Sequence, residues 1–535
     1  MATVFWTLPD ELLIQIAEHL SGNDTTLRSL ARTSRRLQPI AEPVLYRYVF
    51  ARTGEELHRL HLTLDSVSWR SKSIHAIEVR ASVVNHDSSS LVTLQDVIRV
   101  APNLRELMLE SPYCNNESWR HATVTNGWHR TMSSWLDSIV AASPLAPFDP
   151  RPHHDLPDLN SIPNLGARPL QYLKRLTLHL NGMEREFWTM QQEYGGILAH
   201  PTLEDLHISS INIPKDVVAY LPKDLRSPLK RLTLDEANVT LAGLRAVLSI
   251  PEALEYLYIG ENRYSPHERL FPPGQKYNRL PTRNTQGLMD AIGRQKHSLQ
   301  SLTYICNEIT LSPSYIQSTN APALDLTKFE GLRELSVSGC SHSHMLSWCA
   351  AAKAPPRLQR LTIDELVFID VVMEGGLLPG QPPAFIKEAI KAVPQLKQLD
   401  IVGTNENFDL SAPWLVQPRD ATDVAGRYLE ARKCVLRVLR PPTNTRIVRP
   451  ILYGEQEQEN VLMYVNDQQG FRVGLHPDDW LQSEIDSSGD EEDDTDTTSD
   501  EDDEAESSDE EEDEDDEDVS EEGSSDTDTS DSEHG

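Results

Sequence analysis

The stretch FIKEAIKAVPQLKQLDI, residues 385–401, contains a helix-like segment, a proline and a short hexad with alternating apolar residues. Pro394 ends the helix, because proline lacks a backbone N–H and its ring clashes with the preceding turn. The hexad 396–401 predicts a short strand. Residues 240–250, followed by Pro251, repeat the same order. A single helix–strand unit leaves an apolar face uncovered, and stacking against its neighbours would cover that face.

Hexads of this Leu-x-x-Leu-x-Leu-like kind recur along the chain. They begin at Ile74, Leu104, Leu173, Leu203, Leu229, Leu254, Leu299, Leu332, Leu358 and Leu396. Several starts lie 25 to 30 residues apart, near the period of a leucine-rich repeat, and the longer intervals require insertions at about 110–169 and 261–297. The pattern resembles that of leucine-rich-repeat proteins. This resemblance implies an α/β fold in which the repeats form an irregular horseshoe, or solenoid.

Strand alternation predicts where the side chains of each hexad point. The fourth and sixth positions turn inward, and the third and fifth positions lie on the concave face of the sheet. That face is predicted to carry Arg175, Thr177, Asp205, His207, Arg231, Thr233, Tyr256, Tyr258, Ser301, Thr303, Glu334, Ser336, Arg360, Thr362, Gln398 and Asp400. Tyrosine and arginine are frequent interface anchors, so Arg231, Tyr256, Tyr258 and Arg360 are the candidate client-binding residues, with both tyrosines solvent-accessible. The alternative is an ordinary solvated face.

A different pattern occupies the first fifty residues. Residues 8–20, LPDELLIQIAEHL, begin with a proline in the first helical turn and two acidic residues, which favour helix initiation. Their apolar residues fall on one helical face. A break at residues 22–24 precedes a second helical stretch at 27–37, and a third short segment covers 40–49. Three short helices bury little surface alone, so we expect them to dock on something.

The motifs within residues 7–50 carry a family resemblance. They read Leu-Pro-x-Glu-Leu-Leu-x-x-Ile, then Leu-x-x-Leu-x-x-x-Ser-Arg, then Pro-x-Leu-Tyr-Arg, and together they resemble an F-box. The resemblance implies binding to a Skp-type adaptor, which links F-boxes to a cullin ubiquitin ligase. Thr26-Leu27 departs from the frequent Asp-Leu of the family, and Leu37 stands where many members carry tryptophan. The alternative is a helical cap of the repeat body. The adaptor-binding residues that the resemblance implies are Leu8, Pro9, Leu12, Leu13, Ile16, Leu30 and Leu37.

The connecting segments also carry local signals. Thr53 and Glu56 resemble a capping box at the start of a helix that would join the two modules rigidly. A helix is expected at 132–142 in the first insertion, and short strands at 461–465 and 471–475. The predicted segments are an F-box at 1–50, a linker helix at 51–69, the repeat body at 70–440, a C-terminal capping segment at 441–483 and a disordered acidic tail at 484–535.

Acidic residues are concentrated in the tail. The formal net charge is −34, yet residues 484–535 hold 30 Asp and Glu and no Lys or Arg. The remainder has 49 basic against 53 acidic residues, a net charge of −4, which disfavours direct nucleic-acid binding by the body. The tail repels itself and cannot offset its folding entropy, so we expect disorder. Hydroxyl residues with an acid three positions on are phosphorylation candidates: Ser487, Ser488, Thr497, Ser499, Ser507 and Ser508.

No motif predicts enzyme chemistry. The sequence has no Gly-rich phosphate loop, His-Glu-x-x-His or Gly-x-Ser-x-Gly, so no catalytic, cofactor-binding or metal-binding residue is assigned. Cys340, His342, His344 and Cys349 come nearest to a metal cluster, but their spacing fits no common zinc pattern. The cysteines form no Cys-x-x-Cys pair, which favours a reducing compartment. No signal-peptide pattern or membrane-length apolar run is present, so we expect nucleus and/or cytoplasm and no membrane partner.

These patterns favour a non-catalytic interaction protein. The leading hypothesis is a substrate-recognition adaptor of a Skp-cullin-F-box ubiquitin ligase, with a Skp-type adaptor and cullin ligase bound through the F-box and an unidentified client bound through the repeats. The alternative is a histone-binding or nuclear scaffold protein, because an acidic tail attracts basic proteins such as histones.

Overall fold

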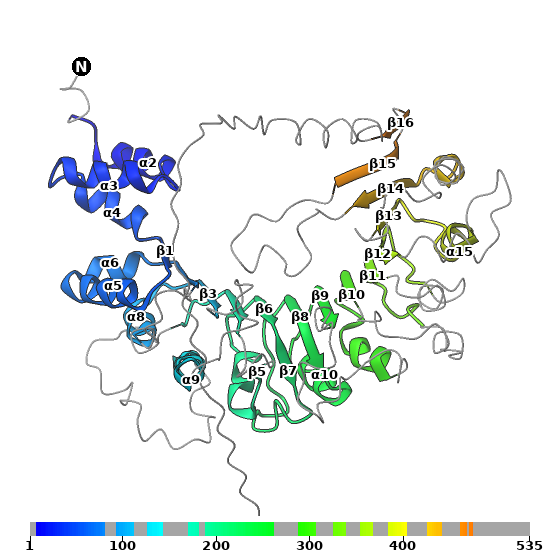
Figure 1. Cartoon of the computed structure of the whole chain (residues 1–535), viewed down its shortest axis with the longest axis horizontal. Helices are drawn as coiled ribbons and strands as arrows, with labels where there is room; N and C mark the ends of the chain where they lie inside the picture. Colours follow the sequence, from blue (N-terminus) through cyan, green and yellow to red (C-terminus); the bar gives the residue numbers. More distant parts are fainter. Residues whose placement is uncertain are drawn as a thin grey trace, which may run out of the picture. The chain divides into compact units, whose positions relative to one another are not determined.

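The structure is a computed structural model, drawn in Figure 1. Contacts group residues Met1–Leu475 into one compact unit. The acidic tail with its six candidate phosphorylation sites, most of both insertions, and the cluster from Cys340 to Cys349 lie outside the described residues. The described residues are 7–80, 93–111, 126–142, 170–180, 188–261, 287–305, 325–338, 354–366, 384–403, 425–440, 461–467 and 470–473.

The described part of the chain is mixed α/β and begins with helices in its N-terminal region. Asn23 begins α3 by accepting a hydrogen bond from the backbone N–H of Thr26 at 3.0 Å, and Pro9 precedes α2, as the sequence predicts. Among the residues described, the helices are α2 (Asp10–His19), α3 (Asp24–Thr33), α4 (Gln38–Leu45), α5 (Gly54–Ser66), α6 (Ser68–Ser73), α8 (Leu94–Val100), α9 (Asn126–Ala142), α10 (Leu241–Leu248) and α15 (Ala384–Ala392), with short 3₁₀ helices η5 (Gln192–Ile197) and η7 (Gly293–Gln295).

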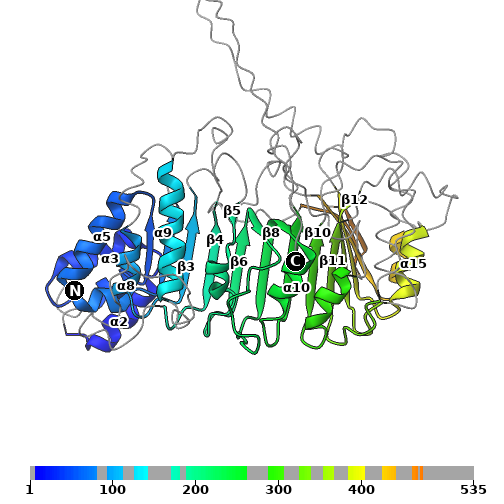
Figure 2. The same ribbon diagram turned by 90° about the horizontal axis from the view of Figure 1, so that it is seen from below.

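One sheet runs through the described chain, with its main strands in order of sequence (Figure 2). Neighbours from β1 to β14 along this path pair in parallel, and β14, β15 and β16 pair antiparallel. The strands are β1 (Tyr48–Ala51), β2 (Ala76–Arg80), β3 (Glu106–Glu110), β4 (Arg175–His179), β5 (Trp188–Thr189), β6 (Asp205–Ser209), β7 (Ile211–Ile213), β8 (Arg231–Val239), β9 (Tyr256–Glu261), β10 (Ser301–Ile305), β11 (Glu334–Ser338), β12 (Arg360–Leu366), β13 (Gln398–Gly403), β14 (Val435–Arg440), β15 (Val461–Asp467) and β16 (Gly470–Val473).

The predicted hexads are confirmed as strands. Each of the ten gives a strand that begins at the hexad's third position, from β2 to β13. Equivalent positions also pair across the sheet: Leu206 lies opposite Leu176 on one side and Leu232 on the other. Side chains of the same type therefore form rows that run across the strands.

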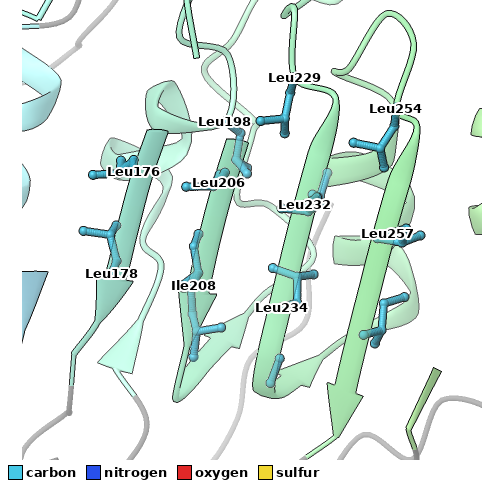
Figure 3. Packing of buried hydrophobic residues seen from close by; sticks show 14 of the residues in the cluster. Leu176, Leu178, Leu198, Leu206, Ile208, Leu229, Leu232, Leu234, Leu254 and Leu257 are labelled. Atoms are coloured by element: carbon cyan, nitrogen blue, oxygen red, sulfur yellow. The ribbon is translucent and has the colours of Figure 1, made fainter. Parts of the chain in front are cut away.

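The inward rows form the core. In Figure 3, Leu176, Leu206, Leu232 and Leu257 lie in one such row on neighbouring strands, and each is at most 1% exposed. Buried residues of α5, α8, α9, α10 and α15 belong to the same cluster. The helices therefore cover one face of the sheet, and the opposite face is called the open face below.

Four of the described strands, β1, β5, β7 and β14, lack a leucine hexad and were not predicted. In β1, Tyr48 pairs with Ala76, so the sheet begins inside the segment assigned to the N-terminal motif. In β14, Val435 lies opposite Gln398, which places Lys433 where other hexads have their first leucine. Lys433 has a positive φ of 58°, so this position is a turn rather than a core contact.

Several local predictions are confirmed. Thr53 and Glu56 form both hydrogen bonds of a capping box, and α5 follows. Leu57 and Leu64 of this helix lie in the main core, so α5 is part of the body and not an isolated linker. The helix expected in the first insertion is α9, and the two C-terminal strands are β15 and β16. No helix in the described residues is long and apolar enough to cross a membrane.

Candidate protein-binding surfaces

Helices α2, α3 and α4 enclose a small core of their own. Leu8, Ile16 and Leu30 are half-buried against it. This cluster is separate from the core of the sheet. Its buried members are Leu13, Ala17, Leu27, Leu37, Ile40, Ala41 and Val44.

The predicted adaptor-binding residues separate into two groups in this cluster. Leu12 is 43% exposed and Pro9 is also exposed, beside the half-buried residues just named. Leu13 and Leu37 are at most 2% exposed. A buried side chain offers no surface to a partner, so these two residues support the face from beneath and do not form it.

Ile14 is an exposed apolar residue that the sequence reasoning missed. It is 44% exposed on α2, on the side of the helix away from Leu12. Its signal in the sequence is an apolar residue outside the helical stripe that faces the core. Helix α2 therefore presents one large exposed apolar side chain on each flank, and either is available to a partner.

Arg36 fixes the N-terminal end of α2. Its guanidinium donates to the Asp10 carboxylate at 2.7 Å and to the Leu8 backbone carbonyl at 2.6 Å. Asp10 also lies in the first turn of α2, where a negative charge is favourable. The backbone at Leu8 is thereby held in place by a residue 28 positions further along the chain.

A mostly buried ion pair connects α4 to α6. Arg70 donates to Glu42 from Nε at 2.8 Å and from Nη2 at 3.0 Å. Gln38 also donates to Glu42, at 2.7 Å. The hydrogen bond to Glu42 raises the pKa of Arg70 above its usual value, so the guanidinium stays charged. This joint holds the N-terminal helices against the helices that follow β1.

The predicted client patch is only partly assembled on the open face. The Arg231 guanidinium lies over the Tyr256 ring, 4.4 Å from its centroid, and Arg231 is exposed. Arg360 lies on β12, three strands from Tyr256 and four from Arg231, where it donates to the buried carboxylate of Asp400 at 2.9 Å. The structure thus brings together Arg231 and Tyr256 but not Arg360.

The expectation that Tyr258 is solvent-accessible is wrong. Its exposure is 3%. A Cβ built on Gly260 would lie 3.0 Å from Tyr258 Cε1 and 3.3 Å from its hydroxyl. The tyrosine ring therefore lies along its own strand, toward the strand's C-terminal end and over Gly260, where the side chain of a larger residue would meet it. Tyr258 is removed from the candidate client residues.

Burial and ion pairing set the pKa values of several titratable groups in and beside the described strands. Burial raises the pKa of the Cys434 thiol to about 12, so it stays protonated and unreactive at neutral pH. Burial lowers the pKa of His179 to about 3. Asp400 is held charged by hydrogen bonds from Arg437 and Gln398, which lower its pKa against the effect of burial. Within the described ranges, no group of three His, Cys, Asp or Glu side chains could hold a metal ion.

Comparisons with known proteins match one family model and a number of solved structures. The F-box-like family matches residues 5–52, a span that contains α2, α3 and α4. Among solved structures, a chain in the crystal structure of the Rad7 and Elc1 complex in yeast is 12% identical, with 68% of this chain and 85% of that chain covered and a TM-score of 0.31. No curated protein matches the chain.

Proposed function

From the F-box-like domain that residues 5–52 form, we propose that this chain is a substrate-recognition adaptor of a Skp-cullin-F-box ubiquitin ligase. The domain binds a Skp-type adaptor, and that adaptor joins the chain to the cullin. The observation that carries this proposal is the exposure of Leu12 and Ile14 on α2, directly within the matched segment. Pro9 and the half-buried Leu8 extend this surface at the start of the helix.

The rest of the chain is proposed to be a leucine-rich-repeat body of the solenoid type. This is supported by ten hexads that form parallel strands in chain order. The first residue of each hexad is apolar and buried, and it precedes the strand. Such a body contacts mainly its own neighbours along the stack and leaves one sheet face open. We propose that a client binds this open face, with Arg231 and Tyr256 among its contacts.

The proposed role is positional and not catalytic. A receptor that binds adaptor and client at once raises the effective concentration of client lysines near a ubiquitin-charged enzyme. This mechanism depends on a fixed geometry between the two binding surfaces. The bidentate pair of Arg70 and Glu42 supports such a geometry, because it connects the F-box-like domain to α6.

A second candidate function is a histone-binding or nuclear scaffold protein. It is favoured by the 30 acidic residues of the tail, which carry almost the whole net charge. Both functions are compatible with a nuclear or cytoplasmic location. The F-box-like domain favours the ligase adaptor, because a scaffold of this kind has no need of an exposed apolar helix at its N-terminus.

Affinity purification of the full chain followed by mass spectrometry tests the choice. The chain offers two exposed helical leucines for a matched comparison, Leu12 in the F-box-like domain and Leu62 on α5, at 43% and 55% exposure. We expect Skp-type adaptor and cullin peptides with the wild type and with Leu62→Asp, and their loss with Leu12→Asp. Recovery of histones without adaptor from all three proteins would contradict the proposal and favour the scaffold.

A further inference from the structure

Three neighbouring strands begin with pairs of like charges whose sign alternates from strand to strand. Each pair consists of the residue before the strand and the strand's first residue, at the second and third hexad positions, for β4, β6 and β8, which lie side by side in Figure 3. We call these six residues the charge stripes. They are Lys174 and Arg175 at the start of β4, Glu204 and Asp205 at the start of β6, and Lys230 and Arg231 at the start of β8, the first of each pair being the residue before the strand.

The two acids of the central strand are shared between the outer strands. Glu204 accepts from Lys174 at 2.6 Å and from Lys230 at 3.0 Å. Asp205 lies 3.7 Å from Arg175 and 3.6 Å from Arg231. The hydrogen bonds from the two lysines lower the pKa of Glu204, so it remains ionised. The alternation is therefore a property of the folded sheet and not only of the sequence.

The stripes remain accessible to a partner. The side chains of Arg175 and Arg231 are each 56% exposed, against 29% for Asp205 between them. The cations thus stand further into solvent than the acid that separates them. Exposed ion pairs of this kind contribute about 0 to 1 kcal/mol each, so re-pairing them with a bound partner costs little.

The spacing of the stripes matches one kind of partner segment. Neighbouring strands lie about 4.8 Å apart, so β4 and β8 are separated by about 10 Å. One turn of an α-helix rises about 5.4 Å, and two turns rise about 11 Å. Side chains on one face of an extended strand recur every ~6.7 Å, so three of them would span about 13 Å and lose register.

We propose that the charge stripes bind an α-helical client segment that lies across the strands and carries an acid, a base and an acid on three successive turns. This inference rests on the proposed function and specifies the chemistry of the client. The acids of the segment meet the cations of β4 and β8, and its base meets Glu204 and Asp205. Tyr256, which Arg231 contacts on β9, supplies an aromatic surface at one end of the helix.

The stripes discriminate against a uniformly acidic segment. Such a segment would place its central acid against Glu204 and Asp205, which are within a Debye length of about 8 Å and repel it. The alternation of paired charges also ends at β3, the strand next to β4. Arg105, the residue before β3, and Glu106, its first residue, have opposite signs, so the pairs of like charges end there, although Glu106 still accepts a hydrogen bond from Arg175 at 3.1 Å. A segment of three turns is therefore the length that the stripes fit.

Designed helical peptides and the full-length chain test this inference by fluorescence anisotropy. Two peptides share one alanine-rich composition and differ only in the order of three charges, Glu-Lys-Glu in one and Glu-Glu-Lys in the other, at one-turn spacing. We expect the first to bind at least about tenfold more tightly, and the preference to shrink when salt rises from about 0.05 M to about 0.3 M. Equal binding of both peptides, or of neither, would overturn the inference.

A charge reversal in the protein gives the matching control. The double variant Glu204→Lys with Asp205→Lys makes the central stripe basic, and it should lose the preference and bind a Glu-Glu-Glu peptide best. Glu55→Lys changes an exposed acid on α5 and should leave the preference intact. Binding of a Skp-type adaptor is measured on the same preparations. Its loss would count against the proposed function, whereas an unchanged peptide preference in the double variant would count against the charge stripes alone.

Discussion

Arg70 donates two hydrogen bonds to the two carboxylate oxygens of Glu42, and the side chains of this pair are only 16% and 10% exposed. Such a pair has little access to water. Removing one partner leaves the other charge buried without compensation, which is the costly way to break an ion pair. Because α4 and α6 each contribute one partner, the pair couples the stability of the F-box-like domain to that of the helices behind it.

Glu42→Ala should therefore destabilise the protein by about 3 kcal/mol. The uncompensated guanidinium of Arg70 is the physical reason, and the free energy of unfolding from urea titration is the measurement. The chain contains a matched control in the exposed pair of Arg59 and Glu55, which lie four residues apart on α5. Arg59→Ala should cost less than about 0.5 kcal/mol. Equal losses in the two variants would show that the joint of α4 and α6 is not a stabilising contact.

This joint also marks what the sequence can and cannot predict. Leucine hexads predicted ten strands because their apolar positions are buried by the strand's own alternation, a local property. Glu42 and Arg70 are 28 positions apart, and neither lies in a motif. Their contact depends on how α4 is placed after folding, and β1 was missed because Tyr48 to Ala51 has no leucine in its pattern. Non-local packing decides both features.

Tyr256 and Tyr258 show the same limit within one strand. Alternation correctly placed both on the open face, yet only Tyr258 is buried there. The difference comes from Gly260, which leaves room for the Tyr258 ring along the strand. The charge stripes likewise become visible only with the register, since Glu204 is 30 positions from Lys174 and 26 from Lys230 along the chain.

Stability should fall as the pH drops from 7 to 5. Burial lowers the pKa of His179 to about 3 and that of His200 to about 4, so both are neutral in the folded state across this range. In the unfolded chain they take up protons near pH 6.5, so the unfolded state binds more protons and gains stability as the pH falls. The contribution of these two histidines to the free energy of unfolding is therefore complete above about pH 6.5 and is lost progressively as the pH falls below that value.

Each buried histidine should contribute about 1 to 2 kcal/mol to this loss between pH 7 and pH 5. His179→Gln should reduce the slope of unfolding free energy against pH, whatever its effect on stability at pH 7. His58→Gln is the control, because His58 is exposed on α5. An unchanged slope in the His179 variant would mean that this histidine is not neutral and buried in solution.

Deleting residues 484–535 should leave the melting temperature nearly unchanged. The deletion changes the formal charge from −34 to −4 and removes almost no apolar side chain. Association with basic proteins such as histones should weaken, because the dense anionic segment attracts them over a Debye length of about 8 Å and loses this attraction as salt rises. A large drop in melting temperature on truncation, measured by calorimetry, would contradict the expectation of a free polyanion.

The central claim is that the start of α2 binds a Skp-type adaptor, and isothermal titration of the purified adaptor into the full chain tests it most directly. The double variant Leu8→Ala with Pro9→Ala should abolish measurable binding, while Leu62→Ala, on exposed α5 surface, should bind as the wild type does. Circular dichroism and the melting temperature of each variant establish that the sheet stays folded. Wild-type affinity in a folded double variant, or no binding by the wild type, would contradict the assignment of this surface.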